Sequence, residues 1–167
     1  MILSRNTGNV QQADFMRCLI VSGSREMITE KNKMGKKKSN NATLKAKLDR
    51  VFSEYIRLRD TAGHSKEGYF RCISCGQIKP YSQADCGHYI GRQHMATRYN
   101  EINCNAQCRF CNRFNEGLKG GYRKGLVQKY GEDKVLLLES QQVKTAKISV
   151  FEYEELIKFY QQKIMEF

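Results

Sequence analysis

The side chains best suited to chemistry in this sequence are two pairs of cysteines, each with two residues between its members. Cys72 and Cys75 form the first pair, which Gly76 follows directly, and Cys108 and Cys111 form the second. One tight turn can hold both sulfurs of such a pair about 2.3 Å from one zinc ion, and four thiolates complete a tetrahedral shell. We therefore predict one structural zinc ion per chain, with buried free cysteines as the alternative.

Polar side chains of the kinds used for hydrolysis lie between and just after these pairs. His88 supplies an imidazole that can take a proton from water near neutral pH. Asp85 and Asn112 supply oxygen ligands for a hard catalytic cation, Mg²⁺ or Mn²⁺. Asn103, five residues before Cys108, is the fourth candidate catalytic residue. The alternative for His88 is a buried or metal-orienting histidine.

Basic residues outnumber acidic ones by 29 to 17, which gives a formal net charge of +12. The excess lies in the first 130 residues, because the last 37 hold five basic and seven acidic side chains. This balance favours a polyanionic partner, since each cation placed on a phosphate releases a condensed counterion. Near the candidate site, the side chains expected to hold a DNA strand are Arg92, Arg98, Arg109 and Arg113.

The segment that carries these residues, 69–117, is predicted to be a β-hairpin joined to a helix. Residues 69–73 are typical of a short strand that runs into the first cysteine pair. No helix breaker stands between Cys111 and Gly117, so the second pair is expected at the start of a helix. A zinc ion bound to both pairs would fix the hairpin against this helix.

Helices are predicted on both sides of that segment, which makes residues 42–167 one α+β domain. Over 42–60, apolar residues recur at spacings of three and four, so one face of the helix is apolar and the basic residues off it either contact phosphate or are solvated. Residues 118–167 are expected to be helical, with a capping box of Ser149 and Glu152 opening the last helix. Residues 1–41 are predicted to form a flexible basic arm, with a solubilising tail as the alternative.

Several pieces of the chain, between about Leu44 and Met165, match one family in order and spacing. They are Glu54–Asp60, Cys72–Gly76, Asp85–Tyr89, Arg98–Tyr99, Asn103, Gln107–Cys108, Cys111–Asn112 and Tyr122–Arg123. In these pieces the sequence resembles the phage NinG/Rap recombination proteins, a branch of the HNH and endonuclease VII-like superfamily of ββα-metal nucleases. The resemblance implies a treble-clef, HNH-like fold and a structure-specific endonuclease that cuts Holliday junctions and D-loops. It also implies that Asn112 binds the catalytic metal and that His88 is the base.

Two positions depart from that pattern. Gly87 stands where most HNH sites have an acidic residue, and Phe114 stands where some relatives have a histidine. Two other functions therefore stay open: a catalytically silent, zinc-stabilised DNA-binding accessory protein of recombination or replication, and an RNA-binding treble-clef module. A homodimer and other phage recombination proteins stay open as partners.

No apolar run of about 18 residues is present, so we expect no membrane-spanning helix. The N-terminus lacks an apolar stretch followed by a small-residue cleavage site, so we expect no secretory signal. The expected location is the cytoplasm of a bacterial host, with the protein encoded by a phage or prophage.

Overall fold

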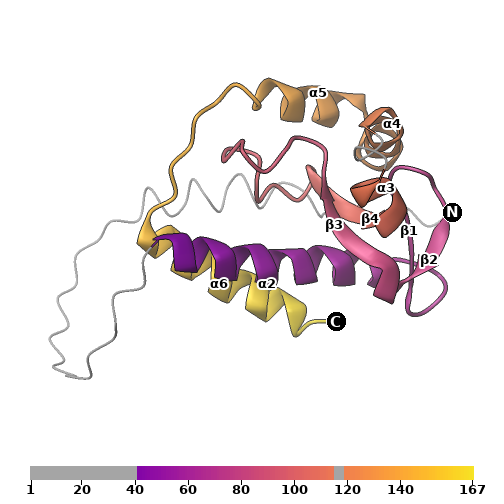
Figure 1. Cartoon of the computed structure of the whole chain (residues 1–167), viewed down its shortest axis with the longest axis horizontal. Helices are drawn as coiled ribbons and strands as arrows, with labels where there is room; N and C mark the ends of the chain where they lie inside the picture. The colour runs from indigo at the N-terminus through magenta and orange to yellow at the C-terminus, as the bar shows by residue number, and fades with distance from the viewer. Residues whose placement is uncertain (1–40, 115–118) are drawn as a thin grey trace, which may run out of the picture. The chain divides into compact units, whose positions relative to one another are not determined.

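A computed structural model describes residues 41–114 and 119–167, which combine helices with short strands (Figure 1). The predicted basic arm, residues 1–41, lies outside the described residues except for Asn41. The elements, in chain order, are α2 (Asn41–Ala62), β1 (Tyr69–Arg71), β2 (Ile78–Pro80), the 3₁₀ turn η1 (Tyr81–Gln83), β3 (Ala84–His88), β4 (Cys104–Cys108), α3 (Arg109–Arg113), α4 (Lys119–Tyr130), α5 (Glu132–Ser140) and α6 (Val150–Ile164).

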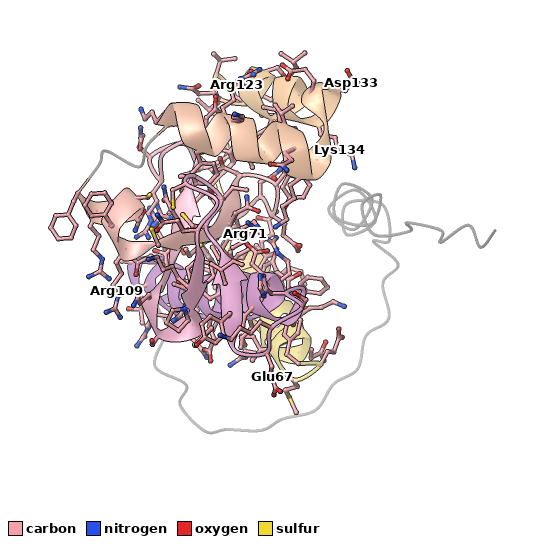
Figure 2. All side chains as sticks on the ribbon, turned by 90° about the vertical axis from the view of Figure 1, so that its right-hand side faces the viewer. Glu67, Arg71, Arg109, Arg123, Asp133 and Lys134 are labelled. Atoms are coloured by element: carbon pink, nitrogen blue, oxygen red, sulfur yellow. The ribbon has the colours of Figure 1, made fainter. Side chains whose placement is uncertain are left out.

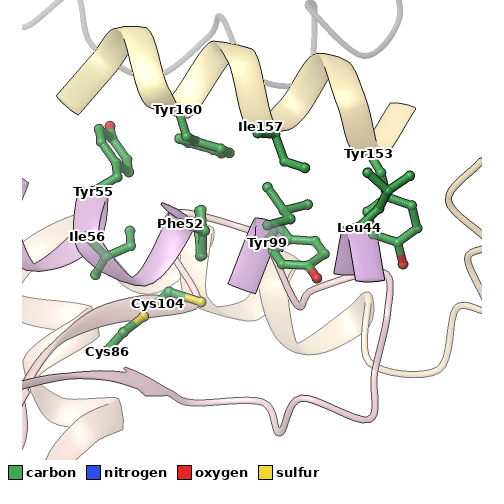
Figure 3. Close-up of a cluster of buried hydrophobic side chains, with 11 residues drawn as sticks. Leu44, Phe52, Tyr55, Ile56, Cys86, Tyr99, Cys104, Tyr153, Ile157 and Tyr160 are labelled. Carbon is green, nitrogen blue, oxygen red and sulfur yellow. The ribbon is translucent and has the colours of Figure 1, made fainter. Parts of the chain in front are cut away.

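Helix α2 contains the helix predicted at 42–60, and its apolar face packs against α6, which lies alongside it (Figure 1). The contact is rich in aromatic rings: Tyr160 of α6 meets Phe52 of α2 edge to face, with ring centroids 4.9 Å apart. Figure 3 shows Tyr153, Ile157 and Tyr160 directed from α6 toward α2. Apolar burial of this kind, at roughly 25 cal/mol per Å², is the main stabilising contribution to the helix pair.

The predicted start of α6 is confirmed. Ser149 precedes the helix and accepts a hydrogen bond from the Glu152 amide, while the Glu152 carboxylate accepts one from the Ser149 amide. The C-terminal part is not helical throughout, because residues 141–149 form a turn and an extended link between α5 and α6.

The strands form two antiparallel hairpins. Strand β1 pairs with β2 around the first cysteine pair, and β3 pairs with β4, so that Asp85 lies opposite Gln107 and His88 opposite Cys104. Helix α2 contacts both strands of the second hairpin. The thiols of Cys86 and Cys104 lie close together in this core, near Phe52 (Figure 3).

Helices α4 and α5 pack on each other and on the chain that follows β3. Tyr122 of α4 is fully buried, and its hydroxyl donates to the carbonyl oxygens of Gly87 at 2.9 Å and Asn103 at 3.2 Å while it accepts from the Asn105 amide. This one side chain therefore holds α4 against both strands of the second hairpin. Among the described helices, none combines the length and the apolar character needed to cross a membrane.

Candidate functional site

The four cysteines of the two pairs come together at one place in the fold. Cys72 follows β1, Cys75 lies in the turn before β2, Cys108 ends β4, and Cys111 lies in α3; their sulfurs are all within 4.8 Å of one another. A tetrahedral zinc ion with bonds of about 2.3 Å holds its sulfurs about 3.8 Å apart, and the Cys75 and Cys108 Sγ atoms are 4.0 Å apart. The donor set therefore suits a metal ion such as zinc.

The turn that holds the first pair depends on local backbone geometry. Gly76 has a φ of 71°, a conformation that L side chains rarely adopt, and its amide donates to the Cys72 carbonyl oxygen at 2.9 Å. The Cys108 amide donates to Cys72 Sγ at 3.3 Å, so one sulfur is hydrogen-bonded by the backbone of the second pair. A metal ion here would join the first hairpin to the junction of β4 and α3.

Directly beside this cluster, Asp85 of β3 meets the helix that carries Cys111. The Asp85 carboxylate accepts a hydrogen bond from Asn112 Nδ2 at 3.0 Å and two from the Arg113 guanidinium at 2.7 and 2.9 Å. Partial burial alone would raise the pKa of Asp85, but these hydrogen bonds and the charges of Arg113 and Arg109 hold it below its usual range. The structure thus brings together two of the four candidate catalytic residues.

These groups line a polar cavity of about 320 Å³ at the outer edge of β3. Its lining combines one carboxylate with three guanidinium groups, and includes Ser53, Arg57, Asp85, Arg92, Asn112 and Arg113. Carboxylate and amide oxygens suit a hard cation, whereas guanidinium groups suit phosphate. Ser53 was not predicted; it lies on α2 four residues before Arg57, so both face the cavity from one side of that helix.

His88 lies at the end of β3 but is not among the residues that line this cavity. Its Nε2 atom is 3.1 Å from the Arg98 carbonyl oxygen, and one of its ring nitrogens is within 4.8 Å of the sulfurs of Cys86 and Cys104. Burial, helped by the charge of Arg92, lowers the pKa of His88 to about 4, so the imidazole is neutral at pH 7. Cys86, His88 and Cys104 also form a second group that could hold a metal ion.

Two further predicted residues are deeply buried. Asn103 donates from its side-chain amide to the carbonyl oxygens of Ile90 and Thr97 and accepts from the Ile90 amide. Arg98 is 8 % exposed, and its guanidinium forms hydrogen bonds of 3.0 and 2.6 Å to the Asp49 carboxylate on α2. Both side chains thus hold the loop between β3 and β4 in place, and neither faces the cavity.

The position before His88 is glycine for a steric reason. A Cβ atom on Gly87 would come within 2.3 Å of Gln107 Oε1 and 2.9 Å of Gln107 Cβ on the paired strand. Gln107 is itself buried and donates to Ser74 Oγ at 2.7 Å, so it has little room to move. An acidic side chain at position 87 would therefore disrupt the second hairpin.

The other predicted DNA-contacting arginines are solvent-facing. Arg92 and Arg109 are exposed, and Arg113 keeps 54 % of its side chain exposed while it pairs with Asp85. Figure 2 shows Arg109 directed outward from the edge of the molecule. Of the four predicted arginines, Arg92 and Arg113 thus line the cavity, Arg109 is exposed on α3, and only Arg98 is buried.

Comparison with known proteins gives the family context. The family model described as "Bacteriophage Lambda NinG protein" matches residues 22–167, so the match includes part of the predicted arm. The protein ninG of Escherichia phage lambda is 34 % identical over 98 residues, which cover 57 % of this chain and 46 % of that protein. The protein ninG of Escherichia phage 933W is equally similar, with 47 % of its length covered. The aligned part thus spans about half the length of these curated relatives. No solved structure matches this chain.

Proposed function

This chain belongs to the family of the bacteriophage lambda NinG protein, and from that premise we propose that it is an HNH-like, metal-dependent endonuclease of phage recombination. Its proposed substrates are branched DNAs such as Holliday junctions and D-loops, and its proposed place of action is the cytoplasm of the bacterial host. The observation that carries the proposal is the cavity beside the cysteine cluster, where Asp85 and Asn112 adjoin three arginines.

The cavity suits phosphodiester hydrolysis because it combines the two kinds of group that a phosphate substrate needs. Asp85 and Asn112 would hold a catalytic Mg²⁺ or Mn²⁺ through oxygen atoms, and when bound that ion supplies positive charge to the phosphate and the departing 3′ oxygen. Arg57 and Arg92 would hold the neighbouring phosphates. Arg113, now paired with Asp85, would exchange that carboxylate for a phosphate when DNA binds.

His88 is the proposed general base. A base must be unprotonated at the working pH, and the lowered pKa of His88 favours the neutral imidazole. Arg92 links the cavity to His88, because its side chain lines the cavity and its charge also lowers the pKa of the His88 ring. The Nε2 contact with the Arg98 carbonyl oxygen would orient the imidazole.

The test is cleavage of a synthetic four-way junction by the full chain, with Mg²⁺ and with a magnesium chelator. We expect nicks with 5′-phosphate and 3′-hydroxyl ends that require Mg²⁺, and we expect an Asp85→Ala/Asn112→Ala variant to bind the junction without cutting it. Loss of cutting in that variant excludes a contaminating nuclease. A wild-type protein that binds junctions but never cuts them would reject the enzyme assignment.

One observation favours a second candidate, a catalytically silent DNA-binding accessory protein. Arg113 makes two hydrogen bonds to Asp85 at 2.7 and 2.9 Å and so neutralises the carboxylate that would hold the cation. In that case Asp85 serves to orient Arg113 toward DNA, and Mg²⁺ has no effect on binding. Competition between branched DNA and RNA in the same binding assay separates both candidates from an RNA-binding role.

A further inference from the structure

Two large apolar side chains project into solvent from the short helix beside the cavity. Phe110 is 67 % exposed and Phe114 is 78 % exposed, and their ring centroids are 6.5 Å apart. They are four residues apart, which places them on the same side of α3 and its C-cap. Contiguous exposed apolar surface with polar residues around it is typical of an interaction site.

The backbone of α3, which carries this aromatic pair, is held by several contacts. Cys108 and Cys111, which flank Phe110, belong to the four-cysteine cluster, and Asn112 is hydrogen-bonded to Asp85. Phe114 caps the same helix, with its amide donating to the Phe110 carbonyl oxygen at 3.1 Å. The backbone that carries the two rings is therefore held next to cavity residues Asn112 and Arg113, which lowers the entropy cost of ordering the rings on a ligand.

The charges around the pair identify the chemistry of its partner. Arg109 precedes Phe110 and is exposed, and Arg113 precedes Phe114 and lines the cavity. An apolar protein partner would offer no acceptor to these guanidinium groups, and it would strip water from Arg109 without replacing it. A nucleic acid satisfies both features, since its phosphates pair with arginine and its bases stack on aromatic rings.

From this placement we propose that Phe110 and Phe114 form a stacking platform for unpaired or unstacked bases at a DNA branch point. Paired bases within a linear duplex are stacked on their neighbours and offer no free face, whereas bases at a junction or fork can turn out at small cost. The platform then gives the protein its preference for branched over linear DNA. This inference rests on the proposed DNA substrate of the neighbouring cavity, but it does not depend on cleavage.

The test measures binding in a magnesium chelator, so that catalysis plays no part. Full-length wild type, Phe110→Ala/Phe114→Ala and Phe110→Trp/Phe114→Trp are titrated with a four-way junction, a fork with unpaired bases and a linear duplex of the same length. The matched control is Phe151→Ala, because Phe151 is 62 % exposed on α6, which carries acidic neighbours instead of arginines. Zinc content and thermal unfolding check that each variant is folded.

We expect the double alanine variant to bind the junction and the fork roughly 5- to 100-fold more weakly, the loss typical of removing an aromatic stacking partner. Binding to linear duplex should change less than about 2-fold, the tryptophan variant should bind like wild type, and Phe151→Ala should match wild type on all three DNAs. A 2-aminopurine placed at the branch point should lose fluorescence on wild type and regain it with the alanine variant.

Equal losses on branched and linear DNA, or no loss on either, would overturn the platform while leaving any Mg²⁺-dependent cleavage by wild type intact. A change from dimer to monomer on removal of the rings would also overturn it and would identify the pair as a protein interface. If wild type showed no preference for branched over linear DNA, both the stacking platform and the proposed branched-DNA substrate would be rejected.

Discussion

Asp85 and His88 are three residues apart on β3, and their side chains contact different parts of the molecule. Asp85 meets Asn112 and Arg113 on α3, whereas the His88 ring lies beside Cys86, Cys104 and the Arg98 carbonyl. Alternate residues of a strand point to opposite faces, so an odd spacing of three separates the two side chains. The proposed metal ligand Asp85 and the proposed base His88 therefore lie on opposite faces of β3.

His88→Ala is the most direct test of that arrangement. If His88 accepts a proton from water, turnover on a four-way junction should fall by about 10²–10⁴-fold, while junction affinity and zinc content stay unchanged. Because the loss is in proton transfer, it should appear in kcat rather than in KM. A His88→Ala protein that nicks at the wild-type rate would leave His88 as a packing residue beside Cys86 and Cys104.

Asn112→Ala should give a different defect. Removing one oxygen ligand weakens the cation site but leaves proton transfer in place, so the Mg²⁺ concentration for half-maximal cleavage should rise while the rate at saturating Mg²⁺ recovers. Gln83→Ala is a suitable control, because Gln83 is exposed and does not line the cavity. An Asn112→Ala protein with unchanged Mg²⁺ dependence would remove Asn112 from the proposed ligand set.

Cys75→Ser should remove the zinc and unfold the chain around it. The metal site forms only in the folded protein, so its binding free energy contributes to folding stability. Elemental analysis should show one zinc per wild-type chain and none in the variant, together with loss of cooperative thermal unfolding. Cys86→Ala is the control, since Cys86 is a buried thiol of β3 that lies outside the four-cysteine cluster. It should keep its zinc.

The sequence predicted the cysteine cluster well because its information is local. Two residues between cysteines fix one turn each, and only the meeting of the two turns requires the fold. The capping box of Ser149 and Glu152 is local for the same reason. By contrast, the cavity depends on Ser53 and Arg57 of α2 reaching the edge of β3, more than 25 residues away, and nothing in their spacing indicates that contact. The burial of Asn103 and Arg98 is likewise decided by partners on distant elements, such as Asp49.

The titration of His88 should make stability depend on pH in a defined window. Its folded pKa of about 4 lies below the ordinary value of 6.5, so between these pH values the unfolded chain binds a proton that the folded chain does not. The stabilising contribution is complete above pH 6.5 and is lost as pH falls toward 4, up to about 3 kcal/mol. Urea unfolding at pH 7.5, 6.5 and 5.5 should show this decline, and His88→Gln should make it shallower. Identical slopes in both proteins would assign the decline to other groups.

Loss of the Asp60 carboxylate should lower the free energy of unfolding strongly, because this buried group links α2 to α4 and β4. Its side chain is 9 % exposed and accepts hydrogen bonds from Arg59 Nε at 2.9 Å, Lys129 Nζ at 2.7 Å and the Ala106 amide at 2.7 Å. Burial alone would raise the pKa of Asp60, but the charges of Arg59 and Lys129 hold it below its usual range. Removing this carboxylate leaves two cations and a backbone N–H group without their shared acceptor.

Asp60→Ala should therefore cost about 3–5 kcal/mol in the free energy of unfolding measured with urea, the range for breaking a buried ion pair by removing one partner. Glu54→Ala, at an exposed position of the same helix, should change it by less than about 0.5 kcal/mol. Adding Lys129→Met to Asp60→Ala should recover part of the loss, because it removes one of the uncompensated charges. If Lys129→Met instead added its full cost to that of Asp60→Ala, the two side chains would be energetically independent despite their 2.7 Å contact.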